Sequence, residues 1–194
     1  LLKNDDNFFD QIIFGIIATA LISVILNFFL PLNKELNSIF QIVIILIYFI
    51  ILKKRFKIKE IKLILFFSFI IFILILFDTE NRPDAYLYHL PYSQILNENK
   101  IIIGLSNFHF RFAHISIFQY LASFNFTIWS GLNGLILPAA IYCVVIFLYF
   151  LNDLKDLKKS KVNYGKVFSL LIFTYICLRI NRYGEFGNDA MAHL

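Results

Sequence analysis

Long apolar runs alternate with short polar segments along most of this chain. Five runs are long or apolar enough to cross a membrane, at 12–30, 39–52, 63–77, 132–151 and 167–180. A full crossing takes about 20 residues, and shorter runs can cross where flanking side chains reach the interface. The pattern predicts an all-α fold, a polytopic bundle of transmembrane helices in one domain over 1–194. Pro138 lies inside the fourth run and is expected to kink it.

Basic residues concentrate in two of the polar segments and set the expected orientation. Six of the 18 lysines and arginines lie in 53–62, and five more lie in 152–166. Short loops rich in lysine and arginine remain on the cytoplasmic side of a membrane. We therefore expect both segments to be cytoplasmic loops, which leaves the residues that follow the third run on the outer side.

The segment 78–131 is then one large outer loop, far longer than an ordinary connection. Part of it, 113–130, is apolar enough to suggest a sixth crossing, but that crossing would place 152–166 outside. Polar residues recur there with helical spacing, at Ser116, Gln119, Ser123, Thr127 and Ser130. This stripe predicts an amphipathic helix in the outer interface, facing polar surroundings and anchored by Trp129.

The composition agrees with a membrane protein and excludes several other classes. The chain has 194 residues, 59% of them hydrophobic and 16% charged, whereas soluble domains carry about 25% charge. Cys143 and Cys177 lie in apolar runs, so both are expected to be small core residues. The net charge of +5 does not indicate nucleic acid, because the basic residues sit between apolar runs. The chain begins at Leu1 without methionine, so we expect a piece of a longer protein.

Polar chemistry is densest at 78–92, immediately after the third run. Asp78, Glu80 and Asp84 precede Tyr88 and His89, and Pro91 suits the first turn of a helix over 90–97. A carboxylate at the membrane–water boundary, surrounded by aromatic rings, suits a general base that deprotonates a hydroxyl. An acidic cap on a solvated loop explains the same residues without any catalytic role.

Two further segments offer groups that could bind a substrate. Arg111 and His114 lie in the aromatic segment 107–116, where an arginine either reaches lipid phosphate or binds a phosphate-bearing substrate. A second set follows the last run, where an ordinary polar turn is the simpler explanation; it comprises Arg182, Asn188, Asp189 and His193. No metal-ligand spacing is present. No apolar run contains an acidic residue, which disfavours a proton-coupled transporter.

Three motifs in order resemble one enzyme superfamily. D-A-Y-L-Y-H-L-P at 84–91, G-L-S-N-F-H-F-R-F-A-H-I-S at 104–116 and the terminal G-N-D-A-M-A-H are similar to a group of bacterial multi-spanning proteins related to the C-type (GT-C) glycosyltransferases. The resemblance covers roughly 60–194. It implies transfer of a sugar from a polyprenyl-phosphate carrier to an acceptor at the outer face of a bacterial plasma membrane.

The resemblance also implies roles for particular residues. Asp84 matches the catalytic loop carboxylate, with His89 beside it, and Asp78 stays a second candidate because the superfamily's carboxylate can lie nearer the span. Arg111 or Arg182 would contact the carrier phosphate, and substrate contacts would extend to Tyr88, His114, Asn188, Asp189 and His193. No dedicated cofactor is implied, although one branch of the superfamily uses a divalent cation. A polysaccharide polymerase or ligase, a transporter and a non-catalytic membrane scaffold remain alternatives.

Overall fold

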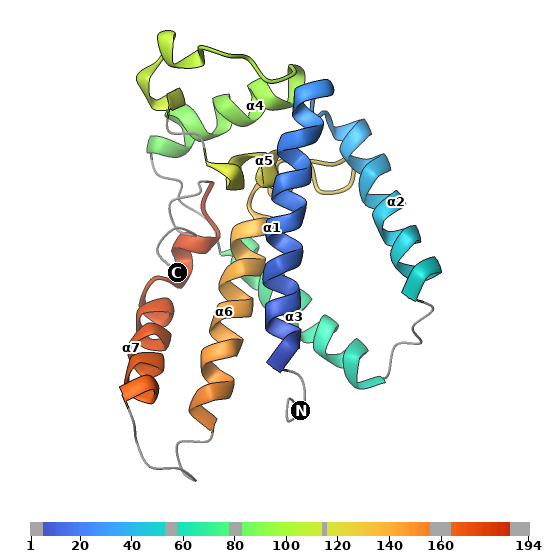
Figure 1. Cartoon of the computed structure of the whole chain (residues 1–194). Helices are drawn as coiled ribbons and strands as arrows, with labels where there is room; N and C mark the ends of the chain where they lie inside the picture. The colour runs from blue at the N-terminus through green and yellow to red at the C-terminus, as the bar shows by residue number, and fades with distance from the viewer. Residues whose placement is uncertain (1–5, 53–57, 78–82, 114–115, 156–163, 187–194) are drawn as a thin grey trace.

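The computed structural model describes residues 6–52, 58–77, 83–113, 116–155 and 164–186 (Figure 1). This part of the chain is all-helical, with seven α-helices and no strands. Their bounds are α1 Asp6–Phe29, α2 Lys34–Leu52, α3 Ile58–Leu76, α4 Leu90–Glu98, α5 Ile117–Phe124, α6 Leu137–Lys155 and α7 Tyr164–Leu178. The all-α prediction is therefore confirmed, and each predicted run coincides with one long helix.

The fourth run begins differently from its prediction. A 3₁₀ helix, η4 (Gly131–Leu135), precedes α6, which therefore starts at Leu137. Pro138 is the second residue of α6. The N–H groups of the first turn have no partner within a helix, so a proline at this position costs no hydrogen bond. The predicted kink is wrong for this reason.

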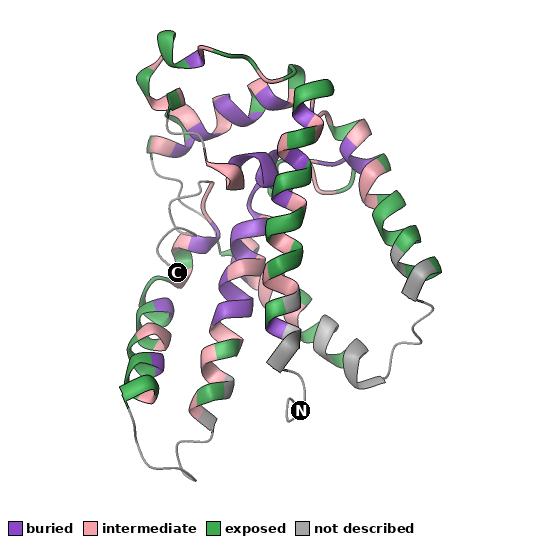
Figure 2. Ribbon diagram, in the orientation of Figure 1, coloured by how far each residue is buried: buried purple, intermediate pink, exposed green. Residues whose placement is uncertain are grey.

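The helices present a large apolar surface. Phe14, Ile25, Ile50, Phe69 and Leu171 are among many large apolar side chains that lie exposed on α1, α2, α3 and α7 (Figure 2). By length and composition, one helix of the described part, at Ile12–Phe29, could cross a membrane. Three other apolar helices there are shorter, at Leu65–Leu76, Leu137–Leu151 and Tyr164–Leu178. The described residues thus contain one candidate membrane span by these criteria.

Three of the long helices, α1, α3 and α7, pack against α6, whereas α2 diverges from them, and α4 and α5 pack together at one end of the molecule (Figure 1). Cys143 is buried between α6 and α7 with Ile146 and Ile176, as expected for a small core residue. Cys177 is exposed, so the prediction for the second cysteine is wrong. It lies next to Ile176, which turns into the core and leaves Cys177 on the outer face of α7.

The segment 113–130 differs most from its prediction. Its only α-helix, α5, has eight residues, and Ser116 caps it by accepting a hydrogen bond from the N–H of Phe118. The polar stripe does not face polar surroundings, because Gln119, Ser123 and Thr127 are all buried. The stripe instead faces the protein interior, where Nε2 of Gln119 lies 3.1 Å from Nδ1 of His89. Asn37 of α2 donates to the backbone carbonyl of Ser123, whose own hydroxyl has no hydrogen-bond partner among the described residues. Trp129 is exposed, beyond the end of α5.

Candidate functional site

Asp84 and Arg111 form an ion pair between two segments that are far apart in sequence. Asp84 occupies the residue before a helical turn, η1 (Ala85–His89), and Arg111 lies in the short 3₁₀ helix η3 (Phe110–Ala113). Nη1 of Arg111 donates to Oδ1 of Asp84. The side chain of Asp84 is 44% exposed and that of Arg111 is 35% exposed, so the pair is accessible to a ligand. The structure thus joins the predicted base and the predicted phosphate contact in one site.

Aromatic rings hold the guanidinium of Arg111 in place. Its carbon Cζ lies 5.1 Å from the ring centroid of Tyr88 and 5.8 Å from that of Phe110. Both distances fall within the range of cation–π attraction, about 6 Å. The arginine is therefore positioned by a carboxylate and two rings, one of which is Tyr88; the predicted contact of Tyr88 with a substrate stays a prediction.

His89 lies next to this pair, but it is buried. Its exposure is 6%, and its Nδ1 lies 3.1 Å from Nε2 of Gln119, a residue of α5 that is 3% exposed. When the amide nitrogen donates, Nδ1 accepts and the ring proton is on Nε2. The rings of His89 and Tyr88 are 4.0 Å apart. His89 is therefore placed to position Tyr88, and the polar stripe of α5 supplies its hydrogen-bond partner.

The helical turn that carries Tyr88 and His89 is a π-helix. The N–H of Leu90 donates to the carbonyl of Ala85, five residues earlier, and the chain then continues as α4. Such wide turns are rare and frequently occur at functional sites. Pro91 lies at the start of α4, so the predicted helix over 90–97 is confirmed within one residue. Asp84 makes no side-chain capping bond at this turn, because its carboxylate binds Arg111.

Behind the site, two phenol groups form a buried contact. The hydroxyl oxygens of Tyr92 in α4 and Tyr120 in α5 are 3.2 Å apart. Burial, and secondarily the bond to Tyr120, raises the pKa of Tyr92 well above its ordinary value. Tyr92 therefore stays neutral, and the contact joins α4 to α5, the helix that carries Gln119.

Of the remaining predicted site residues, the structure describes one, Arg182. Asp78, His114, Asn188, Asp189 and His193 lie outside the described residues. Arg182 lies in the 3₁₀ helix η6 (Ile180–Tyr183), which packs against α3 and α6. Within the described ranges, no group of three or more His, Cys, Asp or Glu side chains could hold a metal ion.

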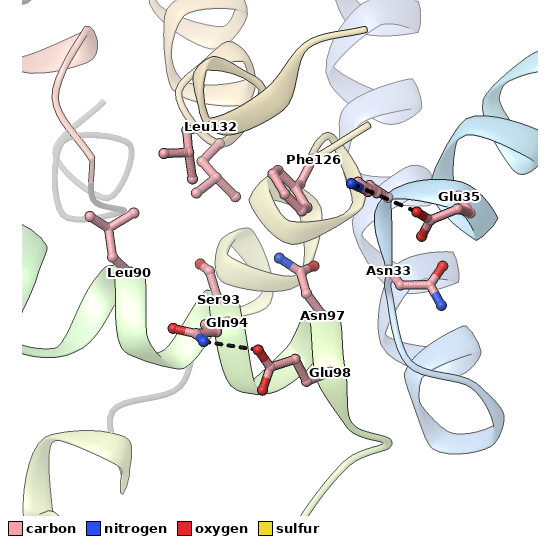
Figure 3. Close-up of a pocket in the computed structure, with 11 residues that line it drawn as sticks. Asn33, Glu35, Leu90, Ser93, Gln94, Asn97, Glu98, Phe126 and Leu132 are labelled. Atoms are coloured by element: carbon pink, nitrogen blue, oxygen red, sulfur yellow. Dashed lines mark hydrogen bonds and ion pairs between the residues drawn. The ribbon is translucent and has the colours of Figure 1, made fainter. Parts of the chain in front are cut away.

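A cavity of about 460 Å³ lies farther along α4 (Figure 3). Its walls are α4, the start of α2, the chain just after α5, and η4. None of the predicted site residues that the structure describes lines it. Sequence reasoning missed this cavity, because its polar lining consists of common asparagine, glutamine and serine residues in separate segments.

Comparison with known proteins gives one family. A family model described as "Domain of unknown function (DUF8201)" matches residues 1–184. The chain belongs to this family. No curated protein and no solved structure matches the chain. The match therefore covers all but the last two of the described residues, and it includes Asp84, Arg111 and the cavity beside α4.

Proposed function

We propose that this member of the DUF8201 family is a membrane-embedded glycosyltransferase, which moves a sugar from a polyprenyl-phosphate carrier to an acceptor. The observation that carries the proposal is the ion pair between Asp84 and Arg111. It joins a group that can bind a phosphate to a group that can accept a proton. The resemblance of 84–91 and 104–116 to the GT-C superfamily supports the same reaction.

In the proposed reaction, the two charged groups act in sequence. The planar guanidinium of Arg111 binds phosphate oxygens, a task for which its fork of donors is suited. The phosphate competes with Asp84 for Arg111, which leaves the carboxylate available to the acceptor hydroxyl. The acceptor oxygen attacks the anomeric carbon, the bond from that carbon to the phosphate oxygen breaks, and the hydroxyl proton passes to Asp84. The products are the new glycoside and the polyprenyl phosphate.

The proposal includes a multi-pass arrangement in a bacterial plasma membrane, with α1, α2, α3, α6 and α7 as spans. The exposed apolar side chains of α1, α2, α3 and α7 support it, because water would disfavour a surface of this kind. The basic segments 53–62 and 152–166 would be cytoplasmic. The end of α6 and the start of α7 lie at the opposite end of the molecule from α4 (Figure 1). Asp84 and Arg111 would then face the outer side.

The test uses the full-length protein in liposomes that contain a decaprenyl-phosphate sugar with a radiolabelled hexose. Asp84→Asn keeps the shape of the side chain but removes the base, so transfer should fall by about 10²–10⁴-fold. Arg111→Lys keeps the charge but loses the planar fork, so it should raise the KM for the carrier. Asp10→Asn, which changes an exposed carboxylate on α1, is the matched control and should leave both parameters unchanged.

The outcomes separate the two candidate carboxylates from each other and from a non-catalytic role. If Asp78→Asn abolishes transfer while Asp84→Asn does not, Asp78 is the base. If both variants fold, insert and transfer sugar like the wild type, the proposed mechanism is wrong. Asp84→Asn should still bind the carrier, seen as an unchanged KM for the carrier in its residual transfer, because Arg111 supplies the phosphate contact.

A further inference from the structure

The cavity beside α4 has a polar wall and an apolar wall that face each other. Ser93 and Asn97 project from α4 toward Phe126 and Leu132 on the opposite side (Figure 3). The volume of about 460 Å³ falls in the lower half of the range of small-molecule sites, roughly 300–1,000 Å³. A molecule of one or two rings would fit such a space.

The polar wall is made of uncharged groups that both donate and accept hydrogen bonds. Ser93, Gln94 and Asn97 supply a hydroxyl and two amides from one helix, and Asn33 adds a third amide across the cavity. The side-chain oxygen of Asn97 is buried without a hydrogen-bond partner in the described part of the chain. Buried polar atoms normally have partners, so this oxygen is an unused acceptor, which a ligand hydroxyl would reach once the side chain of Asn97 turns further into the cavity.

The apolar wall complements such a ligand. Phe126 offers an aromatic ring, and Leu132 and Leu135 continue the same surface. A molecule with hydroxyl groups at its edge and C–H groups on its face can use both walls at once. A purely apolar ligand would leave the side-chain oxygen of Asn97 without a partner.

The charges around the cavity disfavour an anion. Its lining contains two carboxylates, Glu35 and Glu98, and one ammonium group, Lys34. Lys34 lies 3.9 Å from Glu35, while Glu98 accepts a hydrogen bond from Gln94. A phosphate would meet net negative charge here, whereas Arg111 offers it a cation.

We infer that this cavity binds a neutral, polyhydroxylated molecule, a saccharide, through the amide wall of α4 and the ring of Phe126. His89 lies four residues before Ser93, hence on the same side of the helical turn that leads into α4. The saccharide would therefore bind farther along α4 than the ion pair. This is the position at which the acceptor of the proposed reaction would enter. Only this assignment as acceptor depends on the proposed function.

The experiment measures saturation transfer from the full-length protein to maltose by NMR. The protein is held in phospholipid nanodiscs, because glycoside detergents carry the same hydroxyl chemistry as the probe. Asn97→Leu fills part of the cavity and removes the unpartnered amide, so it should weaken maltose binding by tenfold or more. Ser93→Ala is a milder second variant, expected to weaken binding severalfold. Asn99→Leu is the matched control, since Asn99 lies on the same helix end but outside the lining.

Each outcome supports or overturns the inference. Loss of binding in Asn97→Leu and Ser93→Ala, with binding retained in Asn99→Leu and Asp84→Asn, supports it. Absence of maltose binding, or equal binding by all variants, overturns it. Displacement of maltose by inorganic phosphate would also overturn it, because it would place an anion in the cavity. Sugar transfer that is unaffected by Asn97→Leu contradicts this inference alone, whereas maltose binding without any transfer contradicts the proposed function alone.

Discussion

Replacing Asn37 tests how the hydrogen bonds between α2 and the end of α5 stabilise the fold. Asn37 is fully buried near the start of α2. Its Nδ2 lies 2.7 Å from the carbonyl oxygen of Leu32, and 2.9 Å from those of Ser123 and Phe126. An amide nitrogen has two hydrogens, so the three carbonyls share them. This one side chain therefore joins α2 to the end of α5.

The expected loss follows from these bonds. Asn37→Ala removes two hydrogen bonds, each worth about 0.5–1.5 kcal/mol net, and leaves buried carbonyls without donors, so the total is roughly 2–4 kcal/mol. For a chain of this length, each kcal/mol lowers the Tm by roughly 2–4 °C. We therefore expect a decrease of about 5–15 °C in the Tm.

Asn37→Asp should be worse, and its effect should depend on pH. The new carboxyl would face three carbonyl oxygens in a buried site, which raises its pKa in the folded state above the unfolded value of about 3.9. A raised folded pKa adds no penalty below the unfolded value, and stability is lost as the pH rises above it. The Tm of this variant should therefore decrease between about pH 4 and pH 8.

Fluorescence of the single tryptophan, Trp129, reports the unfolding of this region in detergent micelles. It lies directly after Ile128, whose N–H donates to Oγ of Ser38 in α2. Asn107→Ala is the control, because Asn107 is an exposed asparagine in another segment. If Asn37→Ala melts within about 2 °C of this control, or if the Asn37→Asp Tm is the same at both pH values, the reasoning is refuted.

Three other changes test separate parts of the structure. Gly134→Ala should destabilise by about 1–3 kcal/mol, because its Cβ would overlap the backbone just after α5; Gly15→Ala, in open space, should leave the Tm unchanged or higher. Burial raises the pKa of Tyr92, so stability should be lost as the pH rises above about 10, and Tyr92→Phe should lose less in an alkaline titration. A cysteine placed at Lys158 should resist an impermeant thiol reagent in intact cells, whereas one at Asn107 should react; labelling at Lys158 would reverse the proposed orientation.

The sequence was sufficient to predict the long helices, but not which way the shorter one faces. Apolar runs of 14 to 20 residues have few alternatives to a helix, and Pro91 marks the start of α4. The prediction for 113–130 placed the correct polar residues on one face, but it expected that face to meet polar surroundings rather than the protein interior. Helical spacing shows only that polar groups share a face. The partner of this face, His89, is 30 residues away from Gln119, and Asn37, which binds the backbone carbonyl of Ser123, is 86 residues away from it.

The sequence singled out Asp84 and Arg111 as candidate site residues, but it did not predict that they would pair with each other. Asp84 and Arg111 stood out because each is a charged residue in an aromatic segment. Their direct contact spans 27 residues and depends on how η1 and η3 fold against each other. His89 was predicted as catalytic from its closeness to Asp84 in sequence, and that role stays a prediction; its burial against Gln119 could not be read from the sequence.

The π-helical turn before α4 has a consequence for how this site varies among relatives. It holds one residue more than the same length of α-helix would need. Deleting a single residue within Ala85–His89 would restore an ordinary turn and rotate Asp84 by about 100° around the helix axis, away from Arg111. A homologue one residue shorter here would keep its fold and lose the ion pair, even with both residues present. Alignments that sort active from inactive relatives should therefore be read for gaps at this turn as carefully as for substitutions.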